Sequence, residues 1–415
     1  MASMTKNCSR NGQCSTIDEL PCLFIARCAL RFTLQACYSY LMSKENLLII
    51  ASSEKDADLY YATQFIAPDA FVFIQARGKK YILVGDLEVD RAKKQARVDK
   101  VFSTSLLAAG YKKRHKKACS FIEMVLYFLK KQKIKSVLVP GDFPVRYYEP
   151  LRRYGLKIQY KKRLFFEERL TKSPAEIAAI TQALRATEKA AGEAIKILKR
   201  SVIRKNKLYF SGKILTSETI KKVIHGSLLK NGCMGEHTIV SCGHHSVDPH
   251  DQGSGPLYAH QPVIMDIFPR SEKTLYYADF TRTVVRGKAA PCLKKMYAAV
   301  KEGQDIAFKM IRHGVASKKI HGAIQARFTQ LGFKTGLKDG RMQGFFHSTG
   351  HGLGLGIHEP PRISTGDDIL KAGQVVTVEP GLYYKSVGGV RLEDVVVVTK
   401  RGCKNLTKFP RQLEI

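Results

Sequence analysis

The chain beyond residue 46 alternates between short apolar runs and amphipathic segments. Runs such as LLIIA and AFVFIQA are too short for helices and rich in β-branched and aromatic residues, which is typical of strands. Mixed strands and helices over roughly 120 residues indicate a compact α/β domain. The predicted strands are 47–51, 70–76, 79–85, 135–141 and 156–160, and the predicted helices are 54–65, 120–132 and 144–155.

A well-marked helix start predicts a second domain. Ser173 is placed as an N-cap, Pro174 at the first helical position, and Glu176 completes a capping box. Apolar residues then recur along one helical face as far as Leu198. Further helices are predicted at 217–232, 290–314 and 317–333, and strands at 237–243, 261–268, 274–285, 374–384 and 390–399. We therefore expect domains over residues 42–165 and 166–415.

Residues 1–41 do not share these patterns. Met42 begins MSKENLLII, a natural start into a strand, so we expect residues 1–41 to be a leader or an extension that results from an upstream start codon. The stretch 20–42 is the most apolar, but Arg27 and Arg31 interrupt it, so the sequence predicts no membrane span.

Composition is that of a globular protein, with 44% apolar and 25% charged residues. The net charge of +33 raises nucleic acid as a partner. However, the basic residues are spread along the chain, and the densest run, 112–117, has no interleaved aromatic residue, so we do not expect nucleic-acid binding. The ten cysteines include no C-x-x-C pair and no clear secretory signal is present, which favours a reducing, cytoplasmic location.

Four carboxylates lie within apolar, strand-like runs, where an unpaired charge is costly. They are Asp266, Asp279, Glu379 and Glu393. Buried charges need ionic partners or metals. An ion-pair network with Arg282 and Arg391 is therefore the alternative to a metal site.

A glycine-rich stretch, HSTGHGLGLGIHEPP over 347–361, supplies imidazoles from His347, His351 and His358. Glycine lets a backbone bend sharply, and neutral imidazole is the commonest metal ligand. Four carboxylates and the imidazole of His351 would suit two divalent cations, with Mn²⁺ preferred and Co²⁺, Fe²⁺ or Zn²⁺ as alternatives. Two adjacent ions can hold a bridging hydroxide and polarise a carbonyl, so this set indicates hydrolysis.

The motifs around these residues resemble those of the pita-bread metallopeptidases, which include methionine aminopeptidase, aminopeptidase P and prolidase. The matching motifs are DFTRT (279–283), HSTGHGLGLGIHE (347–359), VEPGLY (378–383) and RLED (391–394). The resemblance is closest to the Xaa-Pro aminopeptidases and Xaa-Pro dipeptidases. It implies an α/β protein in which a small creatinase/prolidase-like domain precedes a pita-bread α+β catalytic domain.

The resemblance also implies a role for each metal-site position. Asp266 corresponds to a ligand of the first metal, and Asp279 and Glu393 correspond to bridging carboxylates. His351 and Glu379 correspond to ligands of the second metal, and Glu379 would also move protons.

Substrate contacts are implied at four further positions. His250, in VDPHDQG, corresponds to a histidine that contacts substrate, and His358 to one that stabilises the scissile carbonyl and its tetrahedral intermediate. His347 matches a histidine of the proline-specific members. Arg391 matches an arginine near their site, which could hold Glu393 or bind a substrate carboxylate.

One departure from the family concerns the first two aspartates. Asp266 and Asp279 are 13 residues apart, where the family usually has 11, and Phe268 replaces an expected glycine. We expect a longer hairpin that changes the rim of the pocket.

Together these features predict a dinuclear-metal peptidase that hydrolyses Xaa-Pro bonds, at the N-terminus of peptides or in dipeptides, by attack of a metal-bridging hydroxide. A homodimer without membrane attachment is expected. The alternatives are a methionine aminopeptidase-like activity and a non-enzymatic binding module. Creatinase-like hydrolysis without metal is disfavoured, because all five ligands are present.

Overall fold

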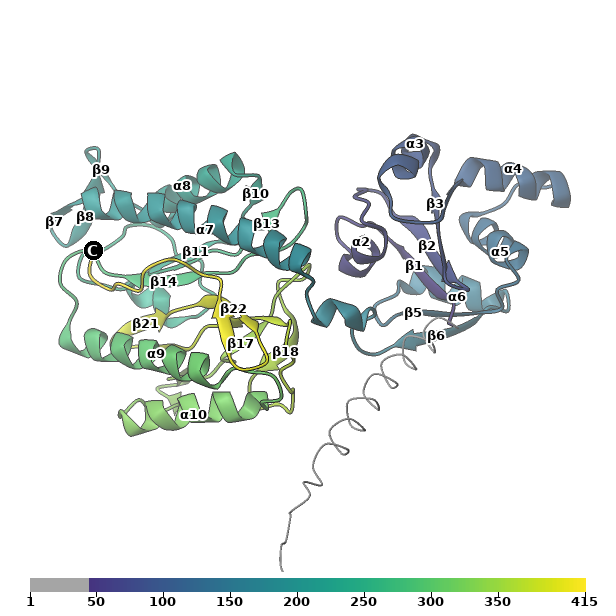
Figure 1. Cartoon of the computed structure of the whole chain (residues 1–415). Coiled ribbons are helices and arrows are strands. Elements are labelled where there is room, and N and C mark those ends of the chain that lie inside the picture. Colours follow the sequence, from purple (N-terminus) through teal and green to yellow (C-terminus); the bar gives the residue numbers. More distant parts are fainter. Residues whose placement is uncertain (1–44) are drawn as a thin grey trace, which may run out of the picture. The chain divides into compact units, whose positions relative to one another are not determined.

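The computed structural model describes residues 45–415, so the predicted extension over residues 1–41 lies outside the described residues (Figure 1). The described chain divides into two compact units. Residues 45–53 and 63–163 form the first, and residues 54–62 and 164–415 form the second. Among the described residues, no helix combines the length and apolar character needed to cross a bilayer.

The first unit is built on a mixed six-stranded sheet in the order β4-β3-β2-β1-β5-β6. β1, β2 and β3 pair antiparallel, and the outer pairs are parallel. Its strands are β1 (Leu47–Ala51), β2 (Phe71–Ala76), β3 (Lys79–Val84), β4 (Lys100–Ser103), β5 (Ser136–Pro140) and β6 (Lys157–Lys161). Its helices are α3 (Asp86–Gln95), α4 (Thr104–His115), α5 (Phe121–Lys131) and α6 (Val145–Arg153), while most of α2 (Ala57–Thr63) falls in the second unit.

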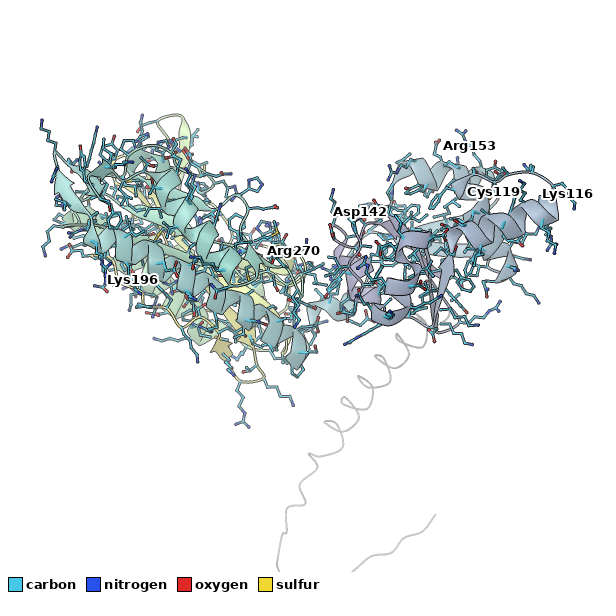
Figure 2. All side chains as sticks on the ribbon, turned by 90° about the horizontal axis from the view of Figure 1, so that it is seen from above. Lys116, Cys119, Asp142, Arg153, Lys196 and Arg270 are labelled. Carbon is cyan, nitrogen blue, oxygen red and sulfur yellow. The ribbon has the colours of Figure 1, made fainter. Side chains whose placement is uncertain are left out.

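Helices α3 and α4 and strand β4 were not predicted, because their apolar pattern is weak. α3 buries only Ala92, and α4 buries only Leu107 and Tyr111. The basic run 112–117 closes α4 and is exposed throughout, with Lys116 at the outer end of the helix in Figure 2. This run is therefore a solvated face, as its composition predicts.

The second unit places its strands between two pairs of helices, with α7 and α8 on one side and α9 and α10 on the other (Figure 1). The predicted capping box at Ser173 and Glu176 is present. α8 ends where Gly232 adopts a φ of 68°, a conformation that glycine reaches without strain. The helices are η1 (Glu167–Leu170), α7 (Pro174–Arg200), α8 (Ser217–Lys230), η2 (Gly243–Val247), α9 (Pro291–Met310) and α10 (Ser317–Gln330).

Two sheets of this unit carry or directly flank the five predicted metal ligands. One has the order β11-β12-β14 and the other β18-β17-β19-β22-β23, while β20 pairs with β21. The strands are β11 (Ile239–Cys242), β12 (Val263–Asp266), β14 (Thr281–Val284), β17 (Gly350–Gly352), β18 (Glu359–Ile363), β19 (Val375–Val378), β20 (Gly381–Tyr384), β21 (Gly388–Arg391), β22 (Asp394–Val398) and β23 (Cys403–Asn405). Shorter strands are β7 (Val202–Arg204), β8 (Lys207–Phe210), β9 (Lys213–Ile214), β10 (Cys233–Met234), β13 (Arg270–Ser271), β15 (Gly336–Lys338) and β16 (Arg341–Gln343).

The hairpin between Asp266 and Asp279 extends well past the end of β12. Backbone hydrogen bonds continue it from Ile267–Phe280 to Ser271–Tyr276, and its outer part, β13, pairs with β10. Asp266 and Asp279 are thus joined by a hydrogen-bonded hairpin, and Phe268 lies near its base, where it lines the pocket described below.

Candidate metal centre and substrate pocket

Strand register brings the predicted carboxylates together. Asp266 pairs with Thr281 across β12 and β14, and Thr281 in turn bridges to Glu393. Glu379 directly follows β19, whose neighbour β17 carries His351. Residues from four separate stretches of sequence thus meet at the strand ends.

Three of these residues form a compact candidate metal cluster. Asp279, His351 and Glu393 each offer a ligand atom, and these atoms lie within 4.8 Å of one another. His351 Nε2 lies 3.2 Å from Glu379 Oε1 and 3.6 Å from Asp279 Oδ2. Its Nδ1 lies 3.1 Å from the carbonyl oxygen of Gly352, so an Nδ1–H that donates there leaves Nε2 directed at the carboxylates.

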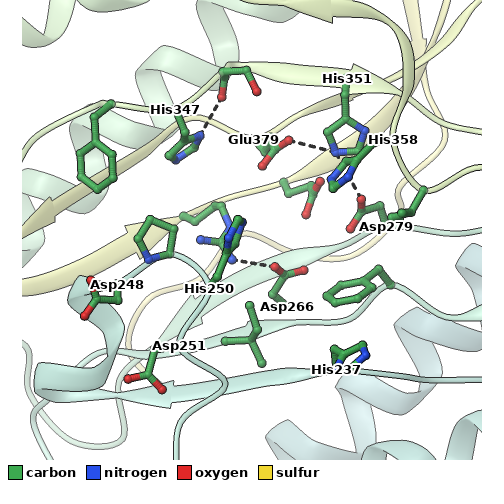
Figure 3. A pocket seen from close by; sticks show the side chains of 18 of the residues that line it. His237, Asp248, His250, Asp251, Asp266, Asp279, His347, His351, His358 and Glu379 are labelled. Carbon is green, nitrogen blue, oxygen red and sulfur yellow. Dashed lines mark hydrogen bonds and ion pairs between the residues drawn. The ribbon is translucent and has the colours of Figure 1, made fainter. Parts of the chain in front are cut away.

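Asp266 approaches the same cluster from the opposite wall (Figure 3). Its Oδ2 accepts a hydrogen bond of 2.6 Å from the guanidinium of Arg391. Its Oδ1 is buried and has no hydrogen-bond partner among the described residues. A buried acceptor without a donor is costly, and a cation at this point would satisfy it.

The electrostatics of the carboxyl groups also fit a bound cation. Burial, and next the charge of Asp266, raises the pKa of Asp279 well above its usual value. Burial, and next the charge of Asp279, does the same to the pKa of Glu393. Positive charge between them would offset both effects, so the donor set suits hard or borderline divalent cations.

Glu379 and His351 favour each other's charged forms. Burial opposes the charge on Glu379, but the hydrogen bond to His351 outweighs it and lowers the pKa of Glu379 to about 2. Burial likewise opposes the charge on His351, but Glu379 raises the pKa of His351 to about 9. A proton shared between them would take the Nε2 position that a metal would use.

The ion-pair network considered as the alternative forms only in part. Arg282 binds Asp394 at 2.8 Å, and it reaches Glu393 only at the backbone oxygen. Arg391 pairs with Asp266, and two further acidic side chains, Asp279 and Glu393, face each other without an arginine between them.

Arg391 is fully engaged by its neighbours. Besides Asp266 it donates to the hydroxyl of Tyr383 at 2.7 Å and to Thr281 Oγ1 at 3.3 Å. Only 3% of its surface is exposed. The guanidinium therefore supports Asp266 directly and reaches Glu393 through Thr281, whose hydroxyl donates to Glu393 at 2.7 Å.

The three predicted substrate-facing histidines differ in their surroundings. The ring of His347 lies 2.7 Å from the Ser348 carbonyl and 3.0 Å from the Tyr383 hydroxyl, and burial lowers its pKa to about 4. His358 is exposed on one side and packs edge-on against His351 on the other. The partial loss of water on the packed side, and next the charge of His351, lower the pKa of His358. His250 is exposed in the loop after η2.

All nine predicted site residues line one cavity of about 1030 Å³. Its other walls are partly apolar, with Ile239, Phe268, Phe346 and Ile357, and Arg362 and Ser364 lie at β18 and just beyond it. The volume and the mixture of apolar walls with a polar floor are typical of a small-ligand site.

Several site residues were not predicted from the sequence. Tyr383 lies in the quoted motif VEPGLY and holds both His347 and Arg391, but a tyrosine in a strand ordinarily indicates packing. Thr281 and Thr377 orient Glu393 and Glu379, a role that only three-dimensional proximity reveals. Arg362 could have been found as a site residue from its position four residues after His358.

Comparisons with known proteins identify the family of this chain. The sequence model of metallopeptidase family M24 matches residues 178–400. A Xaa-Pro dipeptidase of Pyrococcus horikoshii is 30% identical over 299 residues, which are 71% of this chain and 79% of that protein. Among solved structures, the prolidase from Pyrococcus horikoshii has a TM-score of 0.73 at 25% identity, covering 91% of this chain and 97% of its own. An X-Pro aminopeptidase from Thermotoga maritima has a TM-score of 0.76 at 24% identity, covering 91% and 99%.

The chain therefore belongs to metallopeptidase family M24 and is a peptidase. The predicted resemblance to the pita-bread metallopeptidases is confirmed, and so is the predicted fold class, a smaller N-terminal α/β domain followed by the catalytic domain. The alternative of a non-enzymatic binding module is not supported.

Proposed function

We propose that this peptidase hydrolyses Xaa-Pro bonds, in dipeptides or at the N-terminus of longer peptides, with two divalent ions per chain. The observation that carries the proposal is the convergence of three buried carboxylates, the partly buried Glu379 and one imidazole in the cavity that also contains His250, His347 and His358. The names of the relatives, Xaa-Pro dipeptidase and prolidase, support the choice of substrate.

The proposed ligands are Asp266, Asp279, His351, Glu379 and Glu393. Divalent ions held by them would supply a hydroxide nucleophile at neutral pH and a Lewis acid for the scissile carbonyl. We propose Mn²⁺ first, with Co²⁺, Fe²⁺ or Zn²⁺ as alternatives, because oxygen ligands outnumber the single nitrogen.

The chain's own residues would carry out the remaining steps. Glu379 lies beside the cluster with an ionised carboxylate, so it can accept a proton during attack and return it to the leaving nitrogen. His358 is held next to His351, and its lowered pKa keeps it neutral near pH 7, so its N–H can donate to the developing oxyanion. His250 is proposed to contact the substrate backbone.

The walls of the cavity support the proposed selectivity for proline. The proline amide has no N–H, so a site for it must recognise ring shape and the carbonyl. Phe346 and Ile357 offer apolar surface, and His347 is a neutral polar neighbour. A neutral imidazole favours binding of the apolar proline ring, since a charged imidazole would hold water in the pocket.

Arg362 is the proposed partner of a dipeptide's carboxylate. Arg391 is occupied by Asp266 and Tyr383. Arg362, in contrast, is exposed at the cavity wall, on strand β18, which begins directly after His358. A guanidinium binds a carboxylate through two parallel hydrogen bonds. We further propose a cytoplasmic location, in keeping with the free state of the five cysteines among residues 45–415. A homodimer is proposed from the family resemblance alone.

The test is a comparison of kcat/KM for Ala-Pro, Ala-Ala, Met-Ala and Ala-Pro-Ala with purified, Mn²⁺-loaded enzyme. We expect Ala-Pro and Ala-Pro-Ala to be cleaved at least about 100-fold faster than the other two. Preference for Met-Ala would overturn the proposal in favour of a methionine aminopeptidase-like activity.

A further inference from the structure

A buried charge cluster lies directly beneath the loop that carries His358. Glu359, the first residue of β18, is 4% exposed, and its Oε2 accepts a hydrogen bond of 2.8 Å from Lys172 Nζ. Its Oε1 is paired with Arg169, which also binds Asp58 at 2.8 Å. Two cations thus face two carboxylates, and the side chains of Arg169, Lys172 and Glu359 are almost fully buried, while that of Asp58 is 17% exposed.

The same carboxylate holds the loop backbone. Glu359 Oε1 accepts a hydrogen bond of 2.9 Å from the amide of Gly356, two residues before His358. The loop is tied at its other end as well, since Leu353 donates to Val375 and the carbonyl of Gly354 accepts from Tyr277. Glu359 therefore closes a short, doubly anchored loop whose last residue is His358.

The glycines of this loop make room for the cluster. A Cβ at Gly354 would lie 2.6 Å from Glu359 Oε2 and 3.0 Å from Lys172 Cε, and one at Gly356 would lie 3.2 Å from Glu359 Cγ. Neither glycine has a positive φ, so close packing against Glu359 and Lys172 accounts for them better than backbone conformation does.

We infer that Glu359 is a positioning residue for catalysis: held by Arg169 and Lys172, it fixes the 353–358 loop so that the imidazole of His358 faces the reacting carbonyl. The inference rests on the proposed function, in which His358 stabilises the oxyanion. Glu359 does not line the pocket, but it sets the position of His358, which does.

The first test is a double-mutant cycle between Glu359→Gln and His358→Ala in the full-length, Mn²⁺-loaded enzyme with Ala-Pro as substrate. Each single variant should lower kcat by about 10-fold or more, with KM within about 2-fold, because a small misplacement of a catalytic group costs this much. The double variant should be no slower than His358→Ala, since the clamp acts only through His358. Effects that multiply would overturn the inference.

Glu359→Gln leaves buried cations without their partner and could unfold the protein, so a second variant perturbs the clamp without removing a charge. Gly354→Ala should displace Glu359 and lower kcat in the same way. Gly366→Ala, at an exposed loop glycine without a positive φ and with no atom closer than 3.7 Å to the added Cβ, is the matched control and should match the wild type. Equal kcat in the two glycine variants would overturn the inference.

A measurement independent of turnover separates this inference from the proposed function. Hydrogen–deuterium exchange of the amides of 353–358 should be faster in Glu359→Gln than in the wild type, while the amides of β19 keep their protection. Unchanged exchange in the loop would refute the clamp. Absence of Ala-Pro cleavage by the wild type, with faster loop exchange in the variant, would refute the proposed substrate and leave the clamp standing.

Discussion

Replacement of Arg391 by lysine distinguishes the two roles that the sequence left open for this arginine, which are support of Glu393 and binding of a substrate carboxylate. The structure gives the guanidinium three partners, Asp266, Tyr383 and Thr281, and leaves it 3% exposed. A lysine keeps the charge but cannot reach all three from one nitrogen. Arg391→Lys should therefore damage the site as a whole and should not affect the binding of one substrate selectively.

The size of the effect follows from the lost hydrogen bonds. A bond to an ionised group contributes about 1.5–3 kcal/mol and a neutral one about 1 kcal/mol, so loss of part of this set should lower the free energy of unfolding by about 2–4 kcal/mol. Asp266 would lose its orienting partner, and loss of such a contact typically weakens metal binding by about 10–100-fold.

The assay measures kcat/KM for Ala-Pro and Ala-Pro-Ala, together with metal content and the urea unfolding midpoint. In Arg391→Lys both substrates should lose the same factor. Arg362→Lys is the matched comparison and should raise KM for Ala-Pro more than for Ala-Pro-Ala, because only the dipeptide places its carboxylate next to the cleaved bond. A dipeptide-selective rise in KM for Arg391→Lys, with unchanged unfolding and metal content, would refute this reasoning.

Three further predictions address the metal site and the pocket. Glu379→Ala should lower kcat by about 1000-fold or more in metal-loaded enzyme, and near-normal turnover would exclude Glu379 from the catalytic unit. Chelation should abolish turnover. In the metal-free protein the pKa values of Asp279 and Glu393 are raised, so the folded state keeps protons that the unfolded state releases, and the melting temperature should fall as the pH rises above about 4; a flat profile would contradict this. The pKa of His347 is lowered from 6.5 to about 4, so its contribution to stability is full above pH 6.5 and is lost as the pH falls towards 4. Over that range the free energy of unfolding of His347→Gln, measured with urea, should fall by about 2 kcal/mol less than that of the wild type. An identical pH dependence in both proteins would count against this.

Local sequence determined much of this protein. The capping box at Ser173 and Glu176 acts over four residues, and a helix start of this kind forms from its own side chains. The carboxylates could be found because each lies within an apolar, strand-like run of sequence, which is a local anomaly with a physical cost. The motifs around them were specific enough to indicate the family.

Only the tertiary structure decided which charges meet. Arg282 and Arg391 are equivalent candidates in the sequence, yet Arg282 turns to Asp394 while Arg391 holds Asp266, because strand register fixes the face and depth at which each side chain emerges. Glu359 stands beside His358 in the chain, but its partner Lys172 lies 187 positions away. Pairing at such separation depends on the packing of distant elements, and no periodicity within either segment carries that information.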